Sequence, residues 1–267
     1  MKPLVQNALL FFCLCGILQA CSPGNIVYYT FEEFPLGAPV ADPAVPYIIN
    51  NTNPIDSTKG IAWYAFEGET VLLQDQDDYP FRIVNGTALP GQSLRYNCEN
   101  PLSYSNIRMS FFAEEKISLQ STDSISFSWM GIPQIGLGNR SIHIVGNLRY
   151  PNNIGVATVF NIRITNTAIQ LGSWNNDELE FTTIGTSTID QLQFIGILLD
   201  LNTETMDIRL ETSAGLMTMS NIDMLSQGME NPPLSSSRPT LNYYWEADSY
   251  NSSTYYTLDQ VRISKRN

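Results

Sequence analysis

The stretch QLQFIGILLDLNTETMDIRLE, from Gln191 to Glu211, decides the fold class of this chain. Residues 194–201 form a continuous apolar run that is too short to span a membrane and rich in β-branched residues, which predicts a strand buried on both faces. Residues 202–205 have turn chemistry. Residues 206–211 then alternate between apolar and charged side chains, as in a strand with one buried and one solvated face. The stretch therefore predicts a β-hairpin at the centre of an all-β domain.

Similar strand signals recur along the chain, and residues that favour turns separate them. The alternation is cleanest in SISFSWM at residues 124–130. We expect further strands at residues 26–34, 61–66, 70–74, 107–112, 141–148, 156–164, 168–171, 179–183, 241–247 and 258–264. Residues 38–59 read as a long connecting loop, and residues 220–228 as an irregular or helical segment. Many short strands with long connections predict a single two-sheet antiparallel jelly-roll β-sandwich over residues 26–267.

The composition is that of a globular protein with an acidic surface. Apolar residues make up 43% of the 267 residues and charged residues only 15%, so Asn, Ser and Thr supply much of the polar surface. Lysine and arginine number 14 against 26 aspartates and glutamates, for a formal net charge of −12. Because such a chain repels phosphate backbones, nucleic acid is excluded as a partner. The sequence leaves the oligomeric state open.

The first twenty residues have the build of a secretory signal peptide. Lys2 supplies an early positive charge, and residues 8–18 form an apolar core that is short for a transmembrane span. We therefore expect residues 1–20 to be removed on export.

Residues 18–21 (LQAC) resemble the lipobox of bacterial lipoproteins, in which the cysteine becomes the acylated first residue of the mature chain. The resemblance implies lipidation of Cys21, a tether at residues 21–25 and a place at the outer membrane or cell surface. A lipid would anchor the chain to the membrane without spanning it. The alternative is ordinary cleavage after Ala20, which would leave Cys21 as an unmodified N-terminus.

Three further segments resemble the concanavalin A-like, or laminin-G-like, jelly-roll domains of exported bacterial proteins. They are residues 30–32 (TFE), 197–208 (ILLDLNTETMDI) and 258–263 (LDQVRI). The resemblance implies a β-sandwich that binds glycans, in some members cleaves them, and in many holds a structural calcium ion.

A calcium site can be weighed from the residues themselves. Asp259 has the same strand parity as Val261 and Ile263, so its carboxylate should point toward the core, where an unpaired charge is costly. The resemblance implies that a calcium ion joins Asp259 to a first-strand glutamate, Glu32 or Glu33, since calcium prefers oxygen ligands. In the alternative, Asp259 caps a turn and both glutamates are solvated.

Catalytic residues are hard to find. His143 is the only histidine, which excludes a zinc site built from histidines. Glycoside hydrolysis needs two opposed carboxylates. Glu178 and Glu180 share a strand face, but Asn176 stands where the glucanases of this fold carry their nucleophile, so the two glutamates are only weak candidates.

Aromatic side chains give more support to glycan binding. Trp174 lies among loop-forming residues (GSWNN), where exposure is expected, and Tyr243 and Trp245 share one strand face that could form a binding platform. Such residues can equally fill the core. The sequence thus predicts an exported, lipid-anchored protein that binds a polysaccharide or other glycan; the alternatives are a polysaccharide-cleaving enzyme of the same fold and a structural or adhesive envelope module.

Overall fold

The computed structural model describes residues 25–32, 36, 47–49, 53–56, 61–65, 71–73, 81–86, 91–98, 107–112, 119, 123–149, 156–226, 238–248 and 253–266. These residues form strands, turns and irregular segments, and within them there is no helix that could cross a membrane. In chain order the strands are β1 (Asn25–Tyr29), β2 (Tyr47–Ile49), β3 (Asn53–Asp56), β4 (Ile61–Ala65), β5 (Val71–Leu73), β6 (Phe81–Asn85), β7 (Gln92–Asn97), β8 (Ile107–Phe112), β9 (Ser124–Gln134), β10 (Arg140–Arg149), β11 (Val156–Ile164), β12 (Ala168–Asn175), β13 (Glu178–Thr186), β14 (Gln193–Asp200), β15 (Thr205–Thr212), β16 (Gly215–Asp223), β17 (Arg238–Ala247) and β18 (Tyr255–Arg266).

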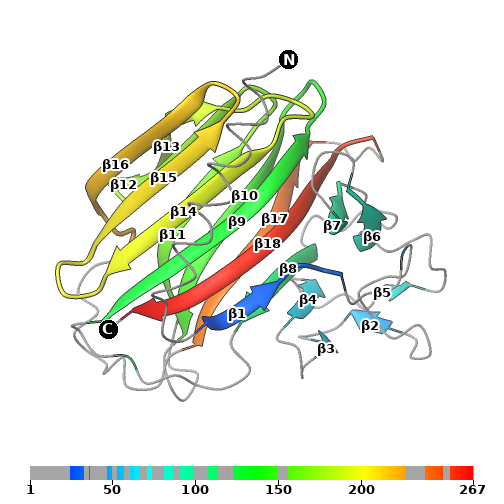
Figure 1. The fold of residues 1–267 in the computed structure, drawn as a ribbon, viewed down its shortest axis with the longest axis horizontal. Coiled ribbons are helices and arrows are strands. Elements are labelled where there is room, and N and C mark those ends of the chain that lie inside the picture. Colours follow the sequence, from blue (N-terminus) through cyan, green and yellow to red (C-terminus); the bar gives the residue numbers. More distant parts are fainter. Residues whose placement is uncertain are drawn as a thin grey trace, which may run out of the picture.

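Two antiparallel sheets pack face to face, which confirms the predicted all-β sandwich (Figure 1). The first, which we call the back sheet, has the strand order β16-β15-β14-β9-β18-β7-β6, with β1 also paired to β18. The second, which we call the concave sheet, has the order β13-β12-β11-β10-β17-β8-β4-β3. Strands β2 and β5 form a separate pair.

The predicted hairpin is strands β14 and β15, joined by a turn in which Asp200 Oδ1 accepts the backbone N–H of Asn202 at 2.8 Å. Every second residue of β14 is buried, and Leu198 between them is partly exposed. The prediction of burial on both faces was wrong, because nothing in the described chain forms a third layer over the back sheet at this strand. The hairpin also lies toward one edge, with only β16 beyond β15.

Five strands were missed in the sequence, among them β6 and β7, which no predicted strand covers. Strands β2 and β3 lie inside the predicted loop at residues 38–59, and β16 extends into the segment that was expected to be irregular or helical. Both β3 and β16 are edge strands. Pro54 in β3 fits an edge, where a missing N–H costs no ladder bond. The side chains of β16 are mostly exposed, so its sequence carries no clear alternation of buried and polar residues.

The core lies between the two sheets and is rich in aromatic rings. Phe127 and Trp129 of β9 point inward from the back sheet. Phe127 meets Phe160 of β11 edge to face at a ring separation of 5.3 Å, and Trp129 meets Tyr243 of β17 at 6.2 Å. These contacts fix which residues of the concave sheet face inward, and the alternate residues therefore face outward.

Candidate functional site

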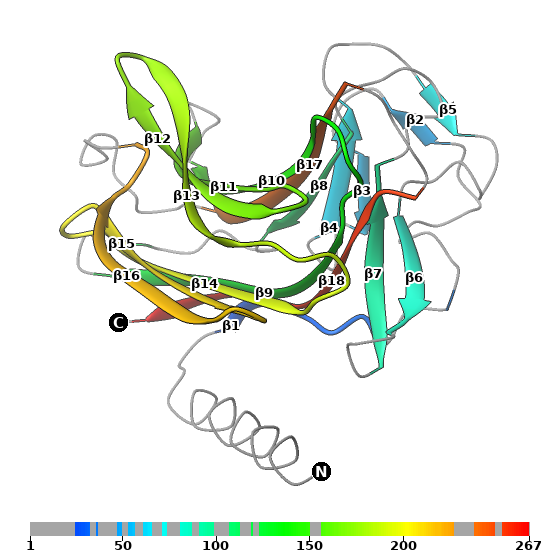
Figure 2. The ribbon, with the colours of Figure 1, turned by 90° about the horizontal axis from the view of Figure 1, so that it is seen from above.

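The outer face of the concave sheet is the candidate site. Figure 2 shows the sheet curving so that the β12–β13 hairpin rises on one side of β10, β11 and β17, and β3, β4 and β8 rise on the other. In β10, Ile142 and Ile144 are buried in the core, so His143 between them points outward. On β17 the register places Tyr244 beside His143. The site is therefore built on strands, which hold side chains more rigidly than loops do.

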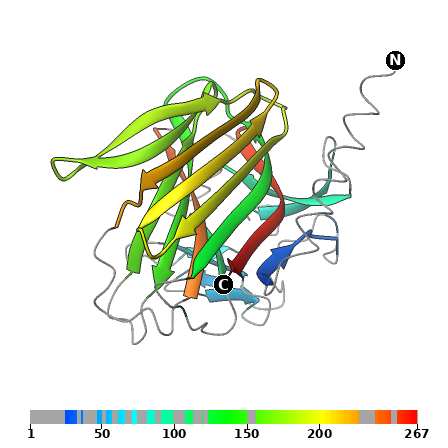
Figure 3. The ribbon, with the colours of Figure 1, turned by 60° about the vertical axis from the view of Figure 1, so that its left-hand side comes forward.

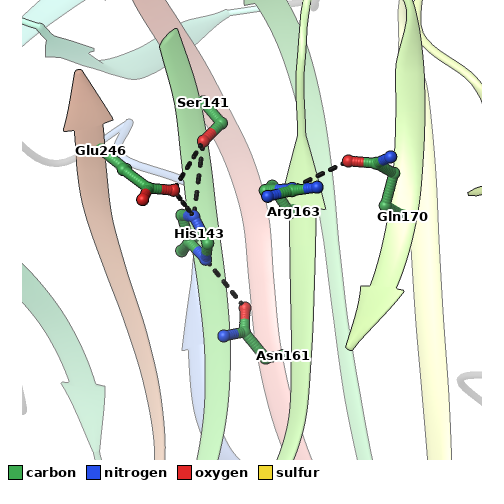
Figure 4. Close-up of polar contacts among 6 residues, drawn as sticks. All are labelled: Ser141, His143, Asn161, Arg163, Gln170 and Glu246. Carbon is green, nitrogen blue, oxygen red and sulfur yellow. Dashed lines mark hydrogen bonds and ion pairs between the residues drawn. The ribbon is translucent and has the colours of Figure 1, made fainter. Parts of the chain in front are cut away.

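His143 is the centre of a polar cluster on this face (Figure 4). Its Nε2 lies 2.8 Å from Glu246 Oε2, and its Nδ1 lies 3.2 Å from the Asn161 side-chain amide. Ser141 Oγ lies 3.4 Å from the same Nε2 and donates a hydrogen bond to Glu246. Because Glu246 can only accept, the imidazole Nε2 carries a proton. Both ring nitrogens of His143 are thus engaged by protein groups.

Two aromatic rings enclose the imidazole. Tyr244 stacks on His143 with ring centroids 4.8 Å apart and planes 10° apart, and Phe181 of β13 meets it edge-on at 5.4 Å. Only 4% of His143 is exposed. Burial lowers the pKa of His143 below its ordinary value, and the positive charge of Arg163 lowers it further, while the bonds to Glu246 and Asn161 act in the opposite direction. At neutral pH His143 is therefore a neutral residue that orders its neighbours.

The lowered pKa predicts how stability depends on pH. A histidine whose pKa is lower in the folded state contributes stability above its unfolded pKa of about 6.5, and this contribution is lost as the pH falls through the folded value. Since the chain has one histidine, its imidazole signals in proton NMR are unambiguous. We expect them to titrate below pH 6.5, and we expect the fall in stability between pH 7 and pH 5 to be smaller in His143→Gln. A midpoint at or above 6.5 would contradict this assignment.

Arg163 of β11 lies next to this cluster on the same face. Its Nε donates to Gln170 Oε1 at 2.8 Å, and the centre of its guanidinium lies 3.9 Å from the Phe181 ring centroid. Gly172 of β12 makes room for this arrangement, since a Cβ there would lie 3.3 Å from the Phe181 ring and 3.4 Å from Asn161 Cβ. Phe181 can therefore lie across the sheet and contact both Arg163 and His143.

Trp174 lies on the same side of the β12–β13 hairpin as Phe181. It has the parity of Gln170 and Gly172 along β12 and is paired with Leu179. The hairpin extends beyond the sandwich, as its yellow-green ribbon in Figure 3 shows. Trp174 is 56% exposed, which confirms the expected exposure, while its contact with a ligand stays a prediction.

The structure corrects the predicted platform of Tyr243 and Trp245. Both side chains are buried between the sheets, where Trp245 packs on Tyr96 at a ring separation of 5.9 Å. The strand alternation was predicted correctly but assigned to the wrong side, so Tyr244 is the residue that faces the site.

Glu178 and Glu180 lie on the other side of the hairpin from Trp174. Glu180 is paired with Ser173 and accepts a hydrogen bond from Asn175 Nδ2 at 3.0 Å, and Glu178 is paired with Asn175. Alternation places all four on the face opposite Trp174. The two carboxylates therefore do not flank a ligand that rests on Trp174.

The environment of Asp259 differs from the expected one. A β-bulge at Gln260, whose φ is +50°, shifts the register, and Asp259 is paired with Met130, which belongs to a small apolar cluster outside the main core. The carboxylate of Asp259 is thus buried on the outer side of the back sheet and does not share the direction of Val261.

Glu32 lies close to Asp259. Burial raises the pKa of Asp259 to about 7, the Gln260 backbone N–H lowers it in part, and the Glu32 charge raises it. Glu32 Oε1 also accepts the Gln92 backbone N–H at 2.9 Å. Glu33 and Cys21 lie outside the described residues, so the structure does not address them.

Sequence reasoning missed seven residues of the site. They are Ser141, Asn161, Arg163, Gln170, Phe181, Tyr244 and Glu246. A signal was present in β11, where Asn161 and Arg163 alternate with buried apolar residues in VFNIRI. Two polar residues at alternate positions of an otherwise buried strand indicate a face with polar partners.

No family model and no curated protein matches this sequence. Among solved structures, the chain is similar to the carbohydrate esterase of Shiga toxin-encoding bacteriophage phi24B, at 7% identity and a TM-score of 0.52 over 91% of this chain and 98% of that one. It is also similar to peanut lectin, at 6% identity and 0.48 over 83% and 97%. An alginate lyase from Pseudomonas aeruginosa gives 11% and 0.46 over 74% and 93%. At such low identity the likeness concerns the fold, and the chain is a jelly-roll β-sandwich.

Proposed function

We propose that this protein binds a glycan on the outer face of the concave sheet. The observation that carries the proposal is the exposed Trp174, which lies on the same face as Tyr244, Arg163 and Gln170. Sugar rings present apolar C–H faces that stack on such indoles, while hydroxyl groups need the fixed hydrogen-bonding partners that the polar side chains supply. The face thus combines one aromatic contact with several polar ones on rigid strands.

The geometry supports binding over cleavage. A general base must reach the proton that it removes, but both nitrogens of His143 are bonded within the protein and the ring is buried. The glutamate pair at residues 178 and 180 lies on the far face of the hairpin. Neither set of groups is placed to act on a sugar stacked on Trp174.

The experiment that tests this function is a binding assay on a panel of soluble and insoluble polysaccharides, with released sugar measured in the same samples. We expect bound protein without released sugar. If oligosaccharides are released and Glu178→Gln abolishes their release, the protein is a polysaccharide-cleaving enzyme of this fold and the binding proposal is wrong. The absence of both binding and release would favour a structural envelope module.

Export and lipid anchoring complete the proposal. The signal-like residues 1–20 and the LQAC sequence support acylation of Cys21 and a place at the cell surface. In this setting the sandwich would meet extracellular polysaccharide directly. Mass spectrometry of the mature N-terminus tests this part, and an unmodified Cys21 would contradict it.

A calcium ion near Asp259 is a further part of the proposal. The two acidic oxygen ligands, Asp259 and Glu32, fit such an ion, because its charge would offset the burial and the smaller Glu32 repulsion that raise the pKa of Asp259. The described residues hold no cluster of three His, Cys, Asp or Glu side chains. The remaining ligands would therefore come from Glu33, backbone carbonyls or water. Bound there, calcium would stabilise the junction of β18 with the first strand.

We expect calcium to change stability and to leave glycan binding unchanged, because Asp259 lies on the back sheet and the candidate site on the other one. Ligand that binds only the folded state at about 100 times its Kd adds about 2.7 kcal/mol to the unfolding free energy. Thermal unfolding with calcium or EDTA measures this effect, which Asp259→Asn should abolish and the exposed-site control Glu178→Gln should keep. If calcium shifts the thermal unfolding of Asp259→Asn and of the unmodified protein equally, calcium does not bind at Asp259.

A further inference from the structure

Arg163 is a positive charge on the concave face that neighbouring side chains hold in place. Its Nε is fixed by Gln170, and Gln170 is fixed in turn through its Nε2, which donates to Thr183 Oγ1 at 3.5 Å. The Phe181 ring supports one face of the guanidinium. A guanidinium held in this way loses little conformational freedom when it binds an anion.

The terminal nitrogens of Arg163 remain available. Within the described part of the chain, no carboxylate forms an ion pair with Arg163, and no side chain accepts a hydrogen bond from its two terminal nitrogens. Glu246, the carboxylate of the neighbouring polar cluster, is bonded to His143. Arg163 is only partly exposed, so an anion that reaches it is partly withdrawn from water, where charge-assisted hydrogen bonds are stronger.

The separation of Arg163 and Trp174 indicates how long a ligand must be to contact both residues. Arg163 is paired with Gln170 across β11 and β12, and Trp174 lies four residues further along β12 on the same face. At about 3.3 Å per residue the two sites are about 13 Å apart along the strand, a distance that a short oligosaccharide can cover. A ligand that reaches both carries an anionic group separated from an apolar sugar face.

We propose that the glycan recognised by this face is acidic, and that Arg163 binds its carboxylate or sulfate group while another sugar of the same chain stacks on Trp174. This inference rests on the proposed glycan-binding function and specifies its ligand. The planar guanidinium matches both anions through paired N–H groups. The protein as a whole carries a net negative charge and repels acidic polymers. An acidic polymer therefore binds strongly only if it presents its charged group at Arg163.

The test compares matched acidic and neutral polysaccharides on the purified full-length chain. Polygalacturonate is compared with its carboxyl-reduced form, and dextran sulfate with dextran, so the two pairs separate carboxylate from sulfate recognition. We expect at least one acidic polymer to bind about tenfold or more tightly than its neutral partner and to weaken as salt rises. Arg163→Gln should lose most of this difference and keep the affinity for the neutral form.

Matched variants separate a local role from a general charge effect. Arg209→Gln removes a positive charge from the back sheet, where Arg209 is paired with Glu211, and should leave binding unchanged. Arg163→Lys keeps the positive charge but loses the planar guanidinium that rests on the Phe181 ring. Its affinity for the acidic polymer should lie between those of Arg163→Gln and Arg209→Gln. Urea unfolding of each variant shows that the fold is intact.

The outcomes distinguish this inference from the function on which it rests. Equal binding of acidic and neutral polymers, or equal losses in Arg163→Gln and Arg209→Gln, would overturn the acidic ligand and leave glycan binding standing. If no polysaccharide binds, acidic or neutral, both proposals fail together.

Discussion

Trp174→Ala is expected to weaken glycan binding about tenfold to hundredfold, with a change in unfolding free energy below about 0.5 kcal/mol. The effect on binding can be separated from an effect on stability, because Trp174 is more than half exposed and lies on a hairpin that extends beyond the sandwich. It can therefore be removed without opening a cavity in the core. Isothermal titration or affinity electrophoresis with the polysaccharide selected by the panel measures the loss.

A matched variant is available on the other sheet. Leu216 of β16 is 61% exposed and apolar, so Leu216→Ala removes a comparable exposed side chain far from the candidate site and should leave affinity unchanged. Trp174→Phe keeps an aromatic face and should retain part of the binding. If Trp174→Ala binds the glycan as tightly as the unmodified protein does, the hairpin is not part of the binding site.

Phe160→Ala is expected to lower the unfolding free energy by about 3–5 kcal/mol. The ring is fully buried, meets Phe127 of the opposite sheet edge to face, and lies over Gly146 of the neighbouring strand. Its loss leaves a cavity between the sheets that rigid strands cannot close. Urea unfolding followed by circular dichroism measures the effect, and a loss below about 1 kcal/mol would contradict this packing.

Gly146 provides the complementary test. A Cβ at this position would lie 2.1 Å from Phe160 Cε1, so Gly146→Ala forces the ring to move and should cost about 1–3 kcal/mol. In the double variant the new methyl enters the space left by Phe160, so the combined loss should be smaller than the sum of the two. As a control, Val156→Ala alters an exposed residue of β11, the strand of Phe160. It should change the unfolding free energy by less than about 0.5 kcal/mol.

The strands that could be predicted from sequence are those with a strong difference between their two faces. Strands β8 and β11 have the predicted bounds, residues 107–112 and 156–164. The edge strands β3 and β16 were missed because an exposed or irregular edge needs no regular alternation. The pleat also predicted correctly that Tyr243 and Tyr244 point in opposite directions. Which of the two directions is the core depends on the other sheet, and no local pattern contains that information.

The candidate site was harder to predict because its contacts join distant residues. His143 reaches Glu246 across 103 positions of the sequence, and Asn161 across 18. The expected direction of Asp259 failed for a different reason: one residue, Gln260, adopts a left-handed backbone conformation and reverses the parity. A glutamine gives no sign of this, since glycine or asparagine is the usual residue with such a φ.

The β12–β13 hairpin is only one chain layer thick, and its two surfaces differ in chemistry. One carries Trp174 and Phe181, and the other carries Glu178 and Glu180. If the proposed acidic polymer binds at Arg163, the two carboxylates would repel it from the other surface of the hairpin. The hairpin would then admit a polymer on its Trp174 surface only, and the polymer would lie along the concave sheet.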